Sequence, residues 1–155
     1  MKSLRALLPL LIMVSALCVT SCDKGGEVSS APKQNKAVTY YTIDGLWQLA
    51  EWNGVPLADG THLYLKLDRK EHRFEMWDNL NSMYTNMRSG SFLLSVDDMQ
   101  RDVISGWYDY GVGDWLNDYF VELNVEGDRM LWRAVDGNEQ MTFVECETLP
   151  DFNKQ

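Results

Sequence analysis

The chain offers few side chains of the types that carry out catalysis. His62 and His72 are its only histidines, and they flank a charged turn without the spacing of a metal site or a catalytic triad. Cys146 follows Val144 in an alternating apolar run, where a thiol is usually a small hydrophobic side chain rather than a nucleophile. Gly111-Val112-Gly113 lacks the helix that a phosphate-binding glycine loop needs. We therefore expect neither an enzyme nor a bound cofactor.

Acidic residues gather around one turn, and carboxylate oxygens are the ligands that calcium prefers. Asp109, Asp114 and Asp118 are the candidates. Their spacing matches no calcium-binding loop, and carboxylates in a turn are ordinarily solvated. We expect no metal site here.

Aromatic side chains are abundant, with six tryptophans, seven tyrosines and five phenylalanines. Large rigid rings line small-molecule pockets, where a hydroxyl or indole N–H can orient a ligand, but they also fill ordinary cores. Trp107-Tyr108-Asp109-Tyr110 would place rings on both faces of one strand. Some of these rings must then face solvent, a partner or the mouth of a cavity.

Cys22 could carry a different chemistry, the covalent attachment of lipid. The chain starts with Lys2 and Arg5, continues with the apolar run 6–14, and reaches Val19-Thr20-Ser21-Cys22. This order closely resembles the lipobox of bacterial lipoproteins, in which a peptidase cuts before the cysteine and acyl chains are added to it. The alternative is an ordinary secretory signal that happens to contain cysteines.

The lipobox resemblance implies a signal peptide over 1–21, followed by a lipidated cysteine and a flexible tether over 22–39. The tether segment is polar and without periodicity. We expect a protein anchored through lipid in the cell envelope, more often at the outer membrane, with its domain in the periplasm or at the cell surface. No later stretch is long and apolar enough to span a bilayer.

Charge and cysteine content restrict the partners and the means of stabilisation. Removal of Lys2 and Arg5 with the signal peptide would change the formal net charge from -9 to -11. That acidity disfavours nucleic acid and anionic lipid surfaces. With Cys22 lipidated, Cys146 would be the only thiol left, so no intramolecular disulfide could form. Stability must come from a packed core.

Residues 40–149 show short alternating runs separated by turn residues, which predicts an all-β domain. The clearest run alternates Leu63, Leu65 and Leu67 with polar or aromatic residues. We expect about eight strands, over 45–52, 63–67, 72–77, 83–95, 103–110, 119–125, 130–135 and 140–146, and a tail over 150–155. The short connections favour an antiparallel up-and-down β-barrel.

The first strand contains Gly45-x-Trp47, which resembles the opening signature of the lipocalins. Asn117-Asp118-Tyr119 resembles the family's second signature, whereas the arginine expected after the last strand is missing. The resemblance is therefore to outlier lipocalins and to lipocalin-like domains of bacterial lipoproteins. It implies a barrel that holds a small, mostly apolar ligand.

We expect a membrane-anchored, lipocalin-like lipoprotein that binds such a ligand inside the barrel. The candidate ligand-binding residues share the inward parity of their strands: Leu65, Leu67, Phe74, Met76, Tyr108 and Tyr119. The alternative is an envelope interaction module with a filled barrel, which would bind a protein or glycan through an exposed aromatic surface. An empty interior would distinguish the first hypothesis from the second.

Overall fold

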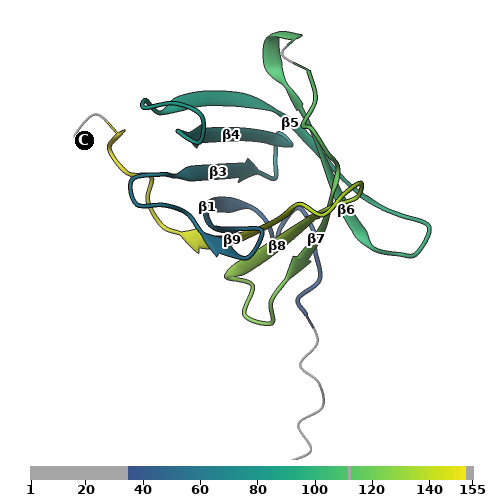
Figure 1. The fold of residues 1–155 in the computed structure, drawn as a ribbon. Helices are drawn as coiled ribbons and strands as arrows, with labels where there is room; N and C mark the ends of the chain where they lie inside the picture. Colours follow the sequence, from purple (N-terminus) through teal and green to yellow (C-terminus); the bar gives the residue numbers. More distant parts are fainter. Residues whose placement is uncertain (1–34, 112, 153–155) are drawn as a thin grey trace, which may run out of the picture. The chain divides into compact units, whose positions relative to one another are not determined.

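The computed structural model describes residues 35–111 and 113–152. These residues form β-strands and one short 3-10 turn (Figure 1). The elements are β1 (Gly45–Trp52), β2 (Val55–Pro56), β3 (Leu63–Asp68), β4 (Arg73–Asp78), β5 (Asn86–Val96), β6 (Asp102–Tyr108), η1 (Asp109–Gly111), β7 (Tyr119–Leu123), β8 (Arg129–Ala134) and β9 (Gln140–Cys146). Within this part of the chain, no helix has the length and apolar character needed to cross a membrane.

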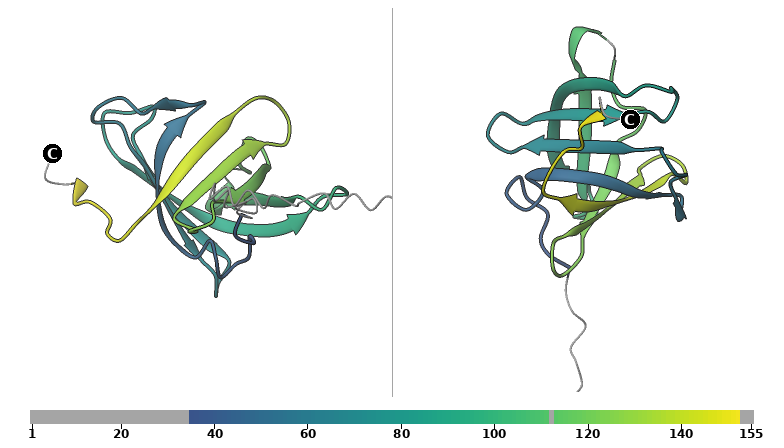
Figure 2. Two further views of the ribbon diagram at one scale, coloured as in Figure 1. Left: turned by 90° about the horizontal axis from the view of Figure 1, so that it is seen from below. Right: turned by 90° about the vertical axis from the view of Figure 1, so that its left-hand side faces the viewer.

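The strands close into one antiparallel barrel. From β3 to β9 each strand pairs with the next in sequence, β1 pairs with β3, and β9 returns to pair with β1 (Figures 1 and 2). The two residues of β2 add only to the end of β1. The predicted up-and-down barrel of about eight strands is confirmed, and its closure removes exposed sheet edges. Cys22 and the segments 1–21 and 22–34 lie outside the described residues.

Alternating residue types explain why these segments form strands with one buried face. In β3, Leu63, Leu65 and Leu67 point into the barrel and are 4%, 0% and 1% exposed. Since successive side chains alternate across a strand, Lys66 points outward, where it pairs with Glu75 of β4. The same alternation continues around the barrel and produces one contiguous hydrophobic core.

A β-bulge interrupts the alternation in β1. Leu49 pairs with Phe143, but the next pair joins Glu51 to Thr142, so Ala50 has no partner in β9. A bulge reverses the facing of the residues that follow it. Glu51 therefore lies outside, within 3.9 Å of Arg129, and Trp52 packs against the core. Asn53 and Gly54 then turn the chain with positive φ angles.

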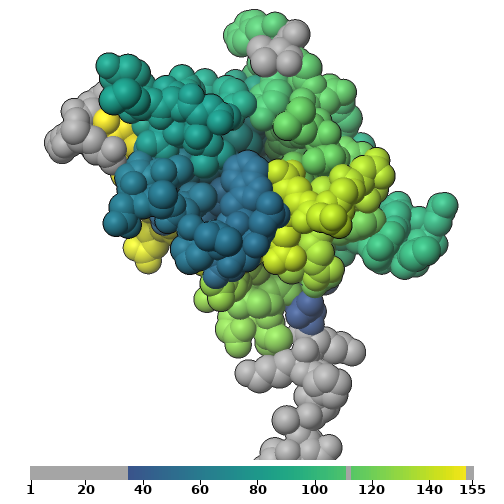
Figure 3. Space-filling view, viewed as in Figure 1, coloured from purple at the N-terminus to yellow at the C-terminus, as the bar shows by residue number. Residues whose placement is uncertain are grey.

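Hydrogen bonds join this turn to the last strand. The backbone N–H of Asn53 donates to the carbonyl of Gln140 at 2.7 Å, and the N–H of Gln140 donates to the side-chain oxygen of Asn53 at 2.8 Å. In the space-filling view, the start of the chain's β-structure and the β8–β9 region lie side by side on one face (Figure 3). The first and last strands thus hold the barrel closed.

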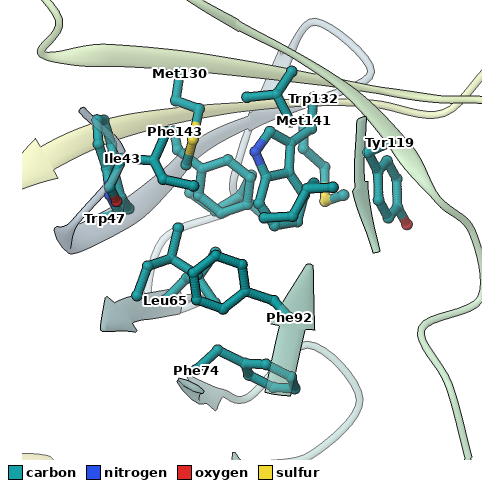
Figure 4. Packing of buried hydrophobic residues seen from close by; sticks show 14 of the residues in the cluster. Ile43, Trp47, Leu65, Phe74, Phe92, Tyr119, Met130, Trp132, Met141 and Phe143 are labelled. Carbon is teal, nitrogen blue, oxygen red and sulfur yellow. The ribbon is translucent and has the colours of Figure 1, made fainter. Parts of the chain in front are cut away.

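The segment that precedes β1 covers one end of the barrel. Trp47 is 1% exposed, and its indole N–H donates to the carbonyl of Ile43 at 2.9 Å. Tyr40 stacks on His72 with ring centroids 4.0 Å apart, and its hydroxyl accepts a hydrogen bond from the N–H of Leu94. Ile43 and Trp47 lie at one side of the core cluster and Tyr119 at the other (Figure 4). We call the end with Ile43 and Trp47 the closed end.

Candidate functional site

The opposite end of the barrel contains a cavity of about 390 Å³, which we call the mouth cavity. Its volume lies within the range of small-molecule sites, roughly 300–1,000 Å³. Side chains from most of the strands and from three connections surround it: Trp52, Leu63, Met76, Leu80, Asn81, Arg88, Tyr108, Asp114, Trp115, Leu116, Tyr119, Trp132, Glu139, Met141 and Phe143.

Tilted aromatic rings in contact with one another lie where the cavity meets the filled part of the barrel. The rings of Phe74 and Trp115 have centroids 5.0 Å apart, those of Trp115 and Trp132 are 5.2 Å apart, and those of Trp132 and Phe143 are 5.0 Å apart. These separations are typical of tilted and offset aromatic pairs. The rings form a rigid apolar floor, against which a flat or chain-like apolar molecule could pack.

Trp115 reaches this floor from the connection between β6 and β7. Its backbone N–H donates to the carbonyl of Gly106 at 2.8 Å, and its ring lies directly over that glycine. A Cβ atom at position 106 would come within 2.2 Å of the indole ring. Glycine in the middle of β6 therefore leaves the space that the indole occupies.

One wall of the cavity carries an ion pair. Arg88 of β5 bonds through its guanidinium to the carboxylate of Asp78, whose side chain is only 5% exposed. The guanidinium also lies over the ring of Tyr108, 5.2 Å from the centroid. Burial raises the pKa of the Tyr108 phenol, with Arg88 opposing the effect. Arg88 thus enters the mouth cavity as a cation that already has a partner.

The facing wall carries a carboxylate that is paired differently. Glu139 precedes β9 and accepts hydrogen bonds from the hydroxyl of Tyr119 at 2.7 Å and from the amide of Asn117 at 3.3 Å. Burial raises the pKa of Tyr119 strongly, and the hydrogen bond to Glu139 adds to this shift. The phenol therefore stays protonated and acts as a donor. Among the described residues, no cation forms a salt bridge with Glu139.

The two central tryptophans have indole N–H groups without acceptors. The nitrogens of Trp115 and Trp132 are buried and have no hydrogen-bond partner within residues 35–111 and 113–152. Because neither nitrogen has appreciable exposed surface, a molecule in the cavity would meet the ring faces rather than these donors. The cavity wall is therefore more apolar than its tryptophan content suggests.

The structure divides the six sequence-predicted ligand residues into two groups. Met76, Tyr108 and Tyr119 line the mouth cavity. Leu65, Leu67 and Phe74 also point into the barrel, but they lie in the filled core and are 0–1% exposed. Of the Trp107-Tyr108 pair, Tyr108 faces inward and Trp107 faces outward with 40% of its surface exposed.

Several lining residues were missed by sequence reasoning. Trp52 faces the cavity only because of the bulge at Ala50. Trp115 lies in a connection, where strand parity makes no prediction, although the isolated Gly106 in the neighbouring strand was a signal of close approach. Arg88 and Glu139 are charged, so a pattern of apolar alternation does not identify them.

The residues considered first for catalysis lie elsewhere. His62 stacks on Phe152 at 4.8 Å and bonds to the hydroxyl of Thr85 at 3.0 Å. Cys146 is a half-buried free thiol whose pKa is raised by burial. Asp109 is bound to Arg73 and to the hydroxyl of Ser89. In the described part of the chain, no three His, Cys, Asp or Glu side chains come together as metal ligands.

No protein family model, curated protein or solved structure matches this chain.

Proposed function

We propose that this protein binds a small, mostly apolar ligand in the mouth cavity, as a membrane-anchored, lipocalin-like lipoprotein of the cell envelope. The observation that carries the proposal is the cavity of about 390 Å³ at the open end of a barrel whose other end is closed. A closed-end barrel of eight strands has an interior of the size that holds one small ligand. The role proposed is binding rather than catalysis.

The distribution of packing supports this role. Towards the closed end, the barrel is filled by Ile43, Trp47, Leu65 and their neighbours. This packed core stabilises the domain without a disulfide. At the opposite end, the mouth cavity has an aromatic floor and apolar walls that include Met76 and Met141. A pocket with apolar walls and a few convergent polar groups is typical of small-molecule sites.

The alternative, an envelope interaction module, has one observation in its favour. Large apolar side chains are strongly exposed around the mouth, with Leu116 96%, Met83 93% and Tyr84 80% exposed. Exposed groups of this kind can mark a contact surface for a protein or glycan. This role would not need the cavity, so a ligand-binding experiment separates the two functions.

The test is the binding of pyrene, a neutral hydrocarbon, to the domain spanning residues 35–155. We expect near one-to-one binding with quenching of tryptophan emission, because several tryptophans line the cavity. Leu80→Trp should weaken binding at least about tenfold, since the larger ring would occupy space at the mouth. The control is Leu93→Trp, which makes the same change at an outward position that is 47% exposed.

Thermal melts of both variants would show that the fold is kept. If the parent domain binds no pyrene, or if Leu80→Trp and Leu93→Trp bind it equally, the mouth cavity is not the ligand site. The interaction-module function would then be preferred.

A further inference from the structure

We infer that the ligand of the mouth cavity carries a protonated amine at its polar end, held by the carboxylate of Glu139. This inference rests on the proposed function, because it concerns the same cavity. It goes beyond that function by naming the polar group of the ligand. It also distinguishes the ligand from a fatty acid, which would place a carboxylate at the mouth.

Glu139 lies in the cavity wall with its carboxylate held in position and with acceptor positions that no described residue occupies. The residue is half-buried, and two neutral donors, Tyr119 and Asn117, fix the position of its Oε2 atom. A carboxylate has about four acceptor positions on its two oxygens. No described residue donates to Oε1, and no cation neutralises the charge, so the carboxylate can accept a charge-assisted hydrogen bond from a ligand.

The other charges around the mouth leave the cavity negative. Arg88 is the one cationic side chain in its lining, and its charge is offset by Asp78. The lining also includes the exposed carboxylate of Asp114. The lining and the Asp78 partner of Arg88 together contain three carboxylates and one guanidinium, in a chain whose formal net charge is -9. This field attracts a cation and repels an anion.

The aromatic walls suit a cation as well. Trp52, Trp115, Tyr119 and Trp132 line the cavity, and the face of an aromatic ring attracts an ammonium group. The chain already uses this interaction once at the same place, since Arg88 lies over the ring of Tyr108. An amine between Glu139 and these rings would combine a salt bridge with cation–π contact.

The experiment compares three ligands that share one apolar chain: decylamine, decanol and decanoate. Each is titrated into the parent domain at neutral pH and low ionic strength, below its critical micelle concentration, with tryptophan quenching and calorimetry as readouts. We expect decylamine to bind at least about tenfold more tightly than decanoate, with decanol between them. Added salt should narrow the difference between decylamine and decanoate, because it screens the charge interaction.

The Glu139→Gln variant tests whether the carboxylate of Glu139 is responsible for the preference for decylamine. It keeps the size of the side chain and an oxygen that can accept from Tyr119, but it removes the charge. We expect a loss of about tenfold in decylamine affinity and little change for decanol. Glu122→Gln is the matched control, since Glu122 is a β7 carboxylate paired with Arg133 on the outside of the barrel.

The outcomes separate this inference from the proposed function. Pyrene binding together with equal or tighter binding of decanoate would overturn the amine inference and leave the cavity as a ligand site. Equal decylamine affinity in the parent and in Glu139→Gln would do the same. Failure of pyrene and of all three decyl ligands to bind would overturn both. If Glu139→Gln fails to fold, the comparison of decylamine, decanol and decanoate in the parent domain still tests whether the cavity prefers an amine.

Discussion

Trp47 combines a large buried surface with a fixed hydrogen bond, because its ring packs into the closed end while its indole N–H donates to Ile43. Trp132 occupies a comparable central position at the floor of the mouth cavity, but its indole N–H has no partner. The same residue type therefore has two roles. One ring closes the barrel, and the other bounds the space that remains open.

We predict that Trp47→Ala lowers the free energy of unfolding by about 3–5 kcal/mol, because it leaves a large cavity in the core and an unsatisfied carbonyl at Ile43. Urea denaturation followed by circular dichroism measures this loss. Trp107→Ala provides the comparison. Its ring faces outward with 40% of its surface exposed, so we expect a loss of about 1 kcal/mol. Equal losses would mean that Trp47 does not close the barrel.

At the scale of elements, β6 and the connection that follows it act as one unit. The connection folds back so that Trp115 lies over Gly106, and Trp107 and Asp114 form an isolated bridge beside this contact. The floor of the mouth cavity therefore depends on a glycine in one element and an aromatic ring in another. Neither residue would build the floor alone.

We predict that Gly106→Ala destabilises the parent domain by about 1–3 kcal/mol, because the new methyl group overlaps the indole ring. In a Trp115→Ala background the same substitution should be neutral or slightly stabilising. The overlap is then gone, and alanine lowers the entropy of the unfolded chain by an amount worth about 0.4–1 kcal/mol. A double-mutant cycle from urea unfolding measures this coupling. An equal cost in both backgrounds would show that the ring is not seated on the glycine.

At the scale of the whole molecule, the chain enters the barrel at the closed end. Lys36 forms an isolated bridge with Leu123, at the end of β7 far from Tyr119 and the mouth cavity. An anchor attached before this point would join the domain at the closed end.

We predict lipid attachment at Cys22, since Val19-Thr20-Ser21-Cys22 resembles a lipobox. Bacterial cells that express the full chain should incorporate radiolabelled palmitate into it, and Cys22→Ala should abolish the label. Cys18→Ala is the matched control, because it removes the other cysteine of the same segment and should leave labelling intact. Equal labelling of Cys22→Ala and of the parent would exclude this site of attachment.

The sequence by itself determined the class and topology of the fold. Alternation such as that of Leu63, Leu65 and Leu67 predicts which face of a strand is buried, and short polar connections favour pairing between consecutive strands. Both properties are local, so they can be recognised along the chain. The exact ends of the strands are less well determined by the sequence. The strand expected over 83–95 is observed as β5 at Asn86–Val96.

Only the tertiary structure decided which part of the interior is open. Leu65 and Tyr119 share the inward parity, yet one lies in the filled core and the other lines the mouth cavity. Their depth depends on how strands from distant parts of the chain are staggered around the barrel, which parity does not specify. Trp52 and Trp115 reach the cavity through a bulge and a connection, and Glu139 is held in the cavity wall by a hydrogen bond from Tyr119, twenty residues away in sequence. Alternation in the sequence describes single strands, whereas the residues that line the cavity are determined by contacts between strands and connections that are distant in sequence.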